Sequence, residues 1–138
     1  MMRVLQKLVL ALIGLAVVFL GADIGLGGIA TLGWQIDPSY VAATLPDVFA
    51  TQDSHTRFLG GVWCAVGLVF LLGAWRTELL RQSIISLCLI IALAGLFRLS
   101  GSWAVVLSND VIGSFLLELI GFPLLALWLA KSATSKST

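Results

Sequence analysis

The chain has 138 residues, of which 59% are hydrophobic and only 11% are charged, and its formal net charge is +1. A soluble domain carries about 25% charged residues, so this composition, with a mean hydropathy of +1.07, argues against a water-soluble globule. The near-neutral charge gives no indication of nucleic-acid binding. Apolar runs of about 18 residues or more recur, which predicts an integral membrane protein.

The first apolar run, Leu8–Ala22, follows two basic residues, Arg3 and Lys7. This pattern fits a signal peptide with a cleavage site at Leu20-Gly21-Ala22, and it also fits a retained first membrane helix. We favour a retained helix over residues 4–32, because the charge distribution described below requires an even number of spans. Four glycines then lie along one helix face and allow close packing against a neighbour; they are Gly14, Gly21, Gly25 and Gly28.

Residues 33–53 read as a connector outside the membrane. Trp34 and Tyr40 are typical of a membrane interface, and Asp37-Pro38 between them indicates a turn. The connector contains acidic residues but no lysine or arginine.

The second apolar segment covers residues 54–75 and the third covers residues 83–104, with a short polar turn predicted at residues 76–82. Ser108-Asn109-Asp110 is a good helix start, because each of these side chains can cap exposed backbone N–H groups. We therefore place the fourth helix at residues 110–130, followed by a disordered polar tail at 131–138.

Basic residues near the predicted helix ends set the orientation in the membrane. All those clearly in loops or at termini fall on one side: Arg3, Lys7, Arg76, Arg81, Lys131 and Lys136. The sequence thus predicts an all-α bundle of four transmembrane helices, forming a single domain over residues 1–138, with both termini in the cytoplasm.

Three charged residues fall inside the predicted spans. At 1.5 Å per helical residue, Glu118 lies about 18 Å above the inner boundary, Arg98 about 24 Å and Arg57 about 27 Å. The hydrocarbon core is about 30 Å thick, and arginine side chains can bridge such differences in depth. We therefore expect Arg57 and Arg98 to converge on Glu118, with His55 and Asp23 close above this cluster.

Two functions are open to such a cluster. The ions can tie three helices together, as bidentate arginine–carboxylate pairs do. Alternatively, they can line a polar pocket for a substrate or ion, as charged groups inside membranes often do. Two arginines facing one glutamate leave excess positive charge, so an anionic ligand or a lipid headgroup is a candidate third partner.

Other chemistry has little support in the sequence. Cys64 and Cys88 lie in apolar runs without a CxxC motif and are most simply packing residues. His55 is the only histidine, which excludes bis-histidine haem ligation. No metal-ligand spacing, phosphate-binding loop or nucleophile elbow is present. We expect no enzymatic activity, no catalytic residue, no bound metal and no cofactor.

Several of these residues resemble the pattern of a known family. Arg57 followed by Gly60-Gly61, Arg98-Leu99 near the end of the third helix, a polar turn and Glu118 in the fourth helix are similar to the DUF4345 family. That family comprises small bacterial four-helix membrane proteins of unknown function, so the resemblance implies a fold and supplies no activity. The turn Ser108-Asn109-Asp110-Val111 departs from the Asp-Gly or Gly-Pro turn expected there.

The sequence favours a structural or accessory protein of the bacterial cytoplasmic membrane, with several spans. Its expected partners are the lipid bilayer and copies of itself or a larger membrane complex. The alternative is a protein that binds or transports a small ligand, ion or lipid at the cluster of Arg57, Arg98 and Glu118. A membrane enzyme acting on a lipid or quinone is a third and weaker hypothesis.

Overall fold

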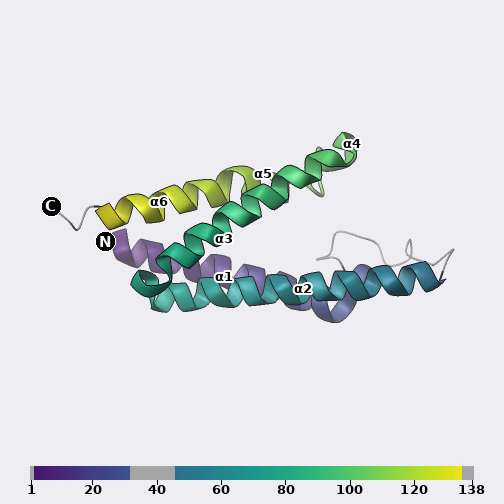
Figure 1. Ribbon diagram of the computed structural model, residues 1–138, viewed down its shortest axis with the longest axis horizontal. Helices are drawn as coiled ribbons and strands as arrows, with labels where there is room; N and C mark the ends of the chain where they lie inside the picture. Colours follow the sequence, from purple (N-terminus) through teal and green to yellow (C-terminus); the bar gives the residue numbers. More distant parts are fainter. Residues whose placement is uncertain (1, 32–45, 135–138) are drawn as a thin grey trace. The chain divides into compact units, whose positions relative to one another are not determined.

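The computed structural model describes residues 2–31 and 46–134, and every regular element in these ranges is helical. The helices form two compact units, Met1–Arg76 and Thr77–Thr138. The first unit contains α1 (Met2–Gly27), the short 3-10 helix η1 (Gly28–Ala30) and α2 (Pro46–Trp75). The predicted all-α fold is therefore confirmed for the described part of the chain (Figure 1).

The second unit contains six helical elements among the described residues. They are α3 (Thr77–Phe97), the 3-10 helix η4 (Arg98–Ser100), α4 (Trp103–Val106), α5 (Ile112–Leu116), the π-helix η5 (Leu117–Gly121) and α6 (Phe122–Thr134). Within this unit α3 packs along η5 and α6.

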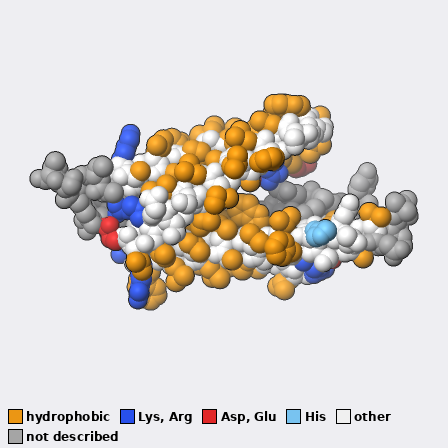
Figure 2. Space-filling view, viewed as in Figure 1, with side chains coloured by type: hydrophobic (Ala, Val, Ile, Leu, Met, Phe, Trp, Pro, Cys, Tyr) orange, Lys and Arg blue, Asp and Glu red, His pale blue; other side chains and the backbone are white. Residues whose placement is uncertain are grey.

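Four helical stretches are long and apolar enough to cross a membrane, as the sequence predicted. They are Val4–Ala30, Val48–Trp75, Thr77–Ser100 and Ile112–Ser132. Hydrophobic side chains cover much of the face seen in Figure 2, as expected of helices that meet lipid rather than water. The chain thus has the character of a multi-pass membrane protein.

Glycines bring α1 and α2 into backbone contact. A methyl group on Gly21 would overlap the backbone of Cys64, and one on Gly60 would overlap the backbone of Gly25. A methyl group on Gly67 would lie only 2.5 Å from the backbone nitrogen of Val18. The predicted close packing along the glycine face of α1 is therefore confirmed, and its partner is the glycine face of α2.

The second helix begins earlier than predicted, at Pro46 instead of Ser54. Proline suits the first helical position, because its missing N–H would have no partner there and its φ is already helical. Residues 46–53, assigned to the connector by the sequence, are two further turns of helix. The rest of the predicted connector, residues 32–45, lies outside the described residues.

The predicted polar turn at residues 76–82 is wrong. Only Arg76 interrupts the helices, and α3 begins at Thr77. Most residues of this stretch are good helix formers, and Arg81 donates to Glu78 at 2.8 Å within one turn. Glu78 also lies in the first turn, where the helix dipole favours a negative charge.

The third predicted helix also ends earlier than residue 104. After Phe97 the chain tightens into η4 and then forms the separate single turn α4. The next helix begins at Ile112, with Val111 in the capping position and without a side-chain cap. The carbonyl of Ser108 accepts the N–H groups of Val111 and Ile112 at 3.1 and 2.9 Å. A backbone carbonyl thus takes the place of the side-chain cap that the sequence predicted from Ser108-Asn109-Asp110.

A wide π-turn precedes Pro123. Proline has no N–H to donate to the carbonyl four residues back, at Leu119. The chain responds with η5, in which the N–H of Phe122 donates to the carbonyl of Leu117, five residues earlier. Local π geometry of this kind is one way in which membrane helices accommodate proline. Beyond it, α6 continues to Thr134, so residues 131–134 of the predicted tail are helical, and residues 135–138 lie outside the described part.

Candidate functional site

The second unit holds a bidentate ion pair between Arg98 and Glu118. The Nε of Arg98 donates to one carboxylate oxygen at 2.8 Å, and one terminal nitrogen donates to the other oxygen, also at 2.8 Å. Glu118 is buried, with a side chain 9% exposed, whereas the Arg98 side chain is 42% exposed. The guanidinium and the carboxylate thus form two parallel hydrogen bonds, which is among the strongest arrangements for a pair of charged groups. The prediction that Arg98 meets Glu118 is confirmed.

Gly95 provides the space in which Glu118 reaches Arg98. A methyl group on Gly95 would lie 2.9 Å from the Cβ of Glu118 and 3.2 Å from one carboxylate oxygen. Gly95 is buried and lies one turn before Arg98 on α3. The glutamate side chain therefore passes across α3 where that helix has no side chain of its own. Its own backbone belongs to the π-turn η5, a geometry that often occurs at functional sites.

The first unit holds a second ion pair, between Asp53 and Arg57. The Nε of Arg57 donates to Asp53 at 2.6 Å, and the two residues are one turn apart on α2. The Arg57 side chain is 44% exposed and that of Asp53 is 19% exposed. Residues at this spacing face each other on a helix surface.

This second pair also closes the end of α1. The N–H of Ile29 donates to Asp53 at 2.9 Å, and Arg57 donates to the carbonyl of Leu26. Gly28 between them has φ of +66°, which favours glycine, and a methyl group there would overlap the Asp53 carboxylate. Two side chains of α2 thus bond one carbonyl in the last turn of α1, which has no helical partner there, and one N–H of η1.

Arg57 therefore has a different carboxylate partner from the one expected. The sequence assigned Asp53 to a connector, and a residue there has no fixed position relative to Arg57. Because α2 begins at Pro46, Asp53 is helical and lies beside Arg57. Both oxygens of Glu118 accept hydrogen bonds from Arg98. Each of the two units thus contains one ion pair of its own, Asp53 with Arg57 in the first and Arg98 with Glu118 in the second.

The sequence missed Asp53, although one signal for it was present. Asp53 and Arg57 are four residues apart, which is the spacing of a helical ion pair. That spacing has meaning only if both residues are helical, so the error in the start of α2 concealed the pair.

His55 and Asp23 were expected close to the charged cluster. His55 is exposed on α2, and Asp23 lies on α1, where its backbone carbonyl accepts the hydroxyl of Thr31 at 3.1 Å. Among the described residues of the first unit, neither side chain is hydrogen-bonded to the ion pair of Asp53 and Arg57. The same residues contain no group of three or more His, Cys, Asp or Glu side chains that would hold a metal ion.

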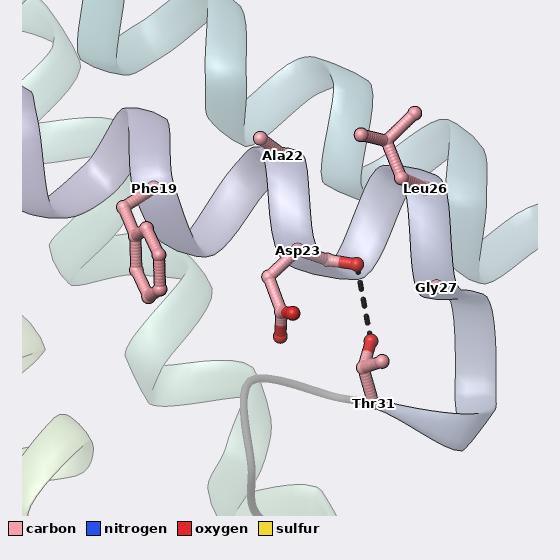
Figure 3. A pocket seen from close by; sticks show the side chains of 6 residues that line it. All are labelled: Phe19, Ala22, Asp23, Leu26, Gly27 and Thr31. Atoms are coloured by element: carbon pink, nitrogen blue, oxygen red, sulfur yellow. Dashed lines mark hydrogen bonds between the residues drawn. The ribbon is translucent and has the colours of Figure 1, made fainter.

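Asp23 instead borders a shallow hollow of about 370 Å³ on α1. Figure 3 shows its carboxylate extending on the same side of the helix as the ring of Phe19. The lining is mostly apolar and comes from one stretch of chain; it consists of Phe19, Ala22, Asp23, Leu26, Gly27 and Thr31. Arg57 of the same unit does not line this hollow.

Comparison with known proteins gives a family and no activity. The family model described as "Domain of unknown function (DUF4345)" matches residues 5–129, nearly the whole chain. No curated protein and no solved structure matches the chain. The match includes all four apolar helices and both ion pairs. The chain therefore belongs to the DUF4345 family of unknown function.

Proposed function

We propose that the protein is a structural or accessory component of the bacterial cytoplasmic membrane that associates with partner chains. In this proposal the bundle has both termini in the cytoplasm and presents its apolar helix faces to lipid and to partner helices. We assign it no catalytic role.

The observation that carries the proposal is the bidentate pairing of Glu118 with Arg98. Both carboxylate oxygens are used within the protein, and the carboxylate is buried. A carboxylate that binds a substrate or carries a proton needs an accessible oxygen, and the Glu118 side chain is only 9% exposed. The pair between Asp53 and Arg57 supports the same function, because its polar atoms are used to hold the end of α1.

Purification from the native membrane in a mild detergent, followed by mass spectrometry, tests the proposal. We expect one or a few membrane proteins in stoichiometric amounts with the full-length chain. A small membrane protein of similar hydropathy, purified in the same way, controls for nonspecific association. Isolation of the chain with lipid alone, at the same level as this control, would contradict an accessory role.

A ligand-binding function is the second candidate, and the exposure of the arginines favours it. The side chains of Arg57 and Arg98 are 44% and 42% exposed, although each already has a carboxylate partner. Half-exposed arginines on a membrane helix suit an anionic lipid headgroup, which guanidinium binds well. Arg98 lies near the end of the span Thr77–Ser100, and Arg57 lies inside the span Val48–Trp75. This candidate places the ligand on the arginines rather than on Glu118.

Replacement of Arg57 distinguishes this candidate from the first. If Arg57 holds an anionic headgroup, Arg57→Gln should lower the amount of co-purified anionic lipid by severalfold while the protein remains folded. Native mass spectrometry measures the bound lipid, and Arg76→Gln at an exposed residue between α2 and α3 is the matched control. Equal lipid binding by wild type and Arg57→Gln would leave the arginine with a structural role only.

A further inference from the structure

One face of α1 points away from α2. Gly14 packs against Leu71 of α2, and Asp23 lies nine residues further along the helix. At 3.6 residues per turn these two residues are on opposite sides of α1. Asp23 therefore faces away from the helix that packs against α1 within the first unit.

The same face carries a regular seam of apolar residues. Its members alternate at spacings of three and four, the pattern by which helices pack in left-handed pairs; they are Leu5, Leu8, Leu12, Leu15, Phe19, Ala22 and Leu26. The large side chains are exposed, with Leu12 at 67% and Leu26 at 82%. We refer to these seven residues as the α1 seam. Lipid can cover such a seam, so the seam alone does not indicate a partner.

Asp23 supplies the independent observation. It follows Ala22 and flanks the seam, within the candidate membrane span Val4–Ala30. None of the described residues forms an ion pair or a side-chain hydrogen bond with its carboxylate, since the bond from Thr31 uses the backbone carbonyl. A carboxylate within a membrane span is costly unless a cation meets it. The hollow around it is otherwise mostly apolar (Figure 3).

We infer that the α1 seam docks a membrane-spanning helix of another protein, and that this helix carries a lysine or arginine opposite Asp23. The negative charge of Asp23 indicates a cationic side chain on the partner, and the spacing of three and four along the α1 seam indicates that the partner is a helix. Flanking positions of such seams often hold the charges that select a partner. This inference rests on the proposed accessory function and specifies the surface by which it would operate.

A second copy of the chain fits this seam poorly. Two copies joined in the same direction along the seam would bring two Asp23 carboxylates to the same depth. Like charges at one level of a helix interface repel each other, and the cost rises where water is absent. A parallel second copy therefore does not supply the complementary charge.

A synthetic peptide provides a direct probe. The peptide is a leucine–alanine membrane helix with apolar residues at alternating spacings of three and four and one lysine, placed seven residues from its end. Asp23 lies seven residues from Ala30, so at 1.5 Å per residue both charges lie about 10 Å inside their helices. A matched peptide has glutamine in place of lysine. Energy transfer between labelled peptide and labelled full-length protein in lipid nanodiscs reports binding.

We expect the lysine peptide to bind about tenfold more tightly than the glutamine peptide, which is the scale of polar contacts between membrane helices. Asp23→Asn should remove this preference, and Asp110→Asn, outside the four candidate spans, should retain it. The double variant Leu12→Ala, Leu15→Ala should weaken both peptides. Equal binding of the two peptides to wild type, or an unchanged preference in Asp23→Asn, would overturn the inference.

Purification of Asp23→Asn from the native membrane separates this inference from the proposed function. Partner proteins that are recovered with wild type and lost with Asp23→Asn support docking at the α1 seam. Partners recovered equally with both contradict docking at this seam and leave the accessory function standing. The absence of any partner with wild type contradicts the accessory function itself.

Discussion

Glu118 is the residue whose burial matters most for the stability of the second unit. Its carboxylate is buried and receives two hydrogen bonds from Arg98. Removing one member of such a pair leaves the other without compensation, although Arg98 is partly exposed and can recover some hydration. Of the two side chains, the buried Glu118 therefore depends more strongly on the pair for compensation of its charge.

Replacement of Glu118 by alanine should lower the free energy of unfolding by about 2 kcal/mol, which is less than the roughly 3–5 kcal/mol of a fully buried broken pair, because Arg98 is partly exposed. Denaturant titration of the detergent-solubilised protein, followed by circular dichroism, measures the change. Gln82→Ala is the control, because this side chain is exposed on α3, where substitutions usually change stability by no more than about 0.5 kcal/mol. Equal midpoints for wild type and Glu118→Ala would show that the ion pair does not stabilise the bundle.

Residue-level prediction from sequence succeeded where one charge had one reachable partner. Arg98 and Glu118 are 20 residues apart, and their meeting followed from their depths along two helices. Depth in the membrane alone could not assign a partner to Arg57, because its partner depends on the residue at which α2 begins. Once α2 includes Asp53, a partner one turn away is available without any tertiary contact.

At the scale of elements, the pair of α1 and α2 depends on glycines on both helices. Gly60 and Gly61 are adjacent on α2, yet a methyl group on Gly60 would overlap the backbone of Gly25, and one on Gly61 would have no atom within 4 Å. The two glycines thus provide a controlled comparison, since their helix propensity is the same and only their surroundings differ.

Gly60→Ala should destabilise the protein by about 1–3 kcal/mol, because the two backbones must move apart. Gly61→Ala should leave stability unchanged or raise it by up to about 1 kcal/mol, since alanine is the better helix former. Unfolding in mixed micelles of increasing sodium dodecyl sulfate measures both. If the two variants behave alike, close backbone contact is not what holds α1 and α2 together.

The sequence predicted the existence of the four spans far better than their ends. Long apolar runs are decisive for a span, because a bilayer leaves the backbone few alternatives. Helix ends depend on finer features, such as Pro46 as a first residue or a helical ion pair between Glu78 and Arg81. The π-turn before Pro123 could be located from the proline, but its hydrogen bond from Phe122 to Leu117 has no signature in composition.

At the scale of the whole molecule, the basic residues predict an orientation in the membrane. The predicted inner side has six lysines or arginines near helix ends, and the predicted outer connector has none. Positive charges in short loops are retained in the cytoplasm during insertion. The proposed orientation, with both termini in the cytoplasm, is a prediction from this charge bias.

Reporter fusions test this orientation. A fluorescent protein fused after Thr138 should be fluorescent, and alkaline phosphatase fused there should be inactive, because the C-terminus is expected in the cytoplasm. Phosphatase inserted between Asp37 and Ser39 should be active. Active phosphatase at the C-terminus would reverse the orientation, and activity at both sites would contradict four spans.

The π-turn has a consequence for how changes in chain length are tolerated. Five residues form this turn where a regular helix needs four, so one residue is accommodated as an insertion. Deleting one residue between Glu118 and Phe122 would restore a regular helix and leave α6 in nearly the same register with α5, because the five residues of a π-turn take up about the arc of four residues in an α-helix. Only the side chains inside the turn would be re-aimed, and Glu118 is one of them. Its contact with Arg98 across Gly95 therefore depends on the extra residue, whereas the direction of α6 does not.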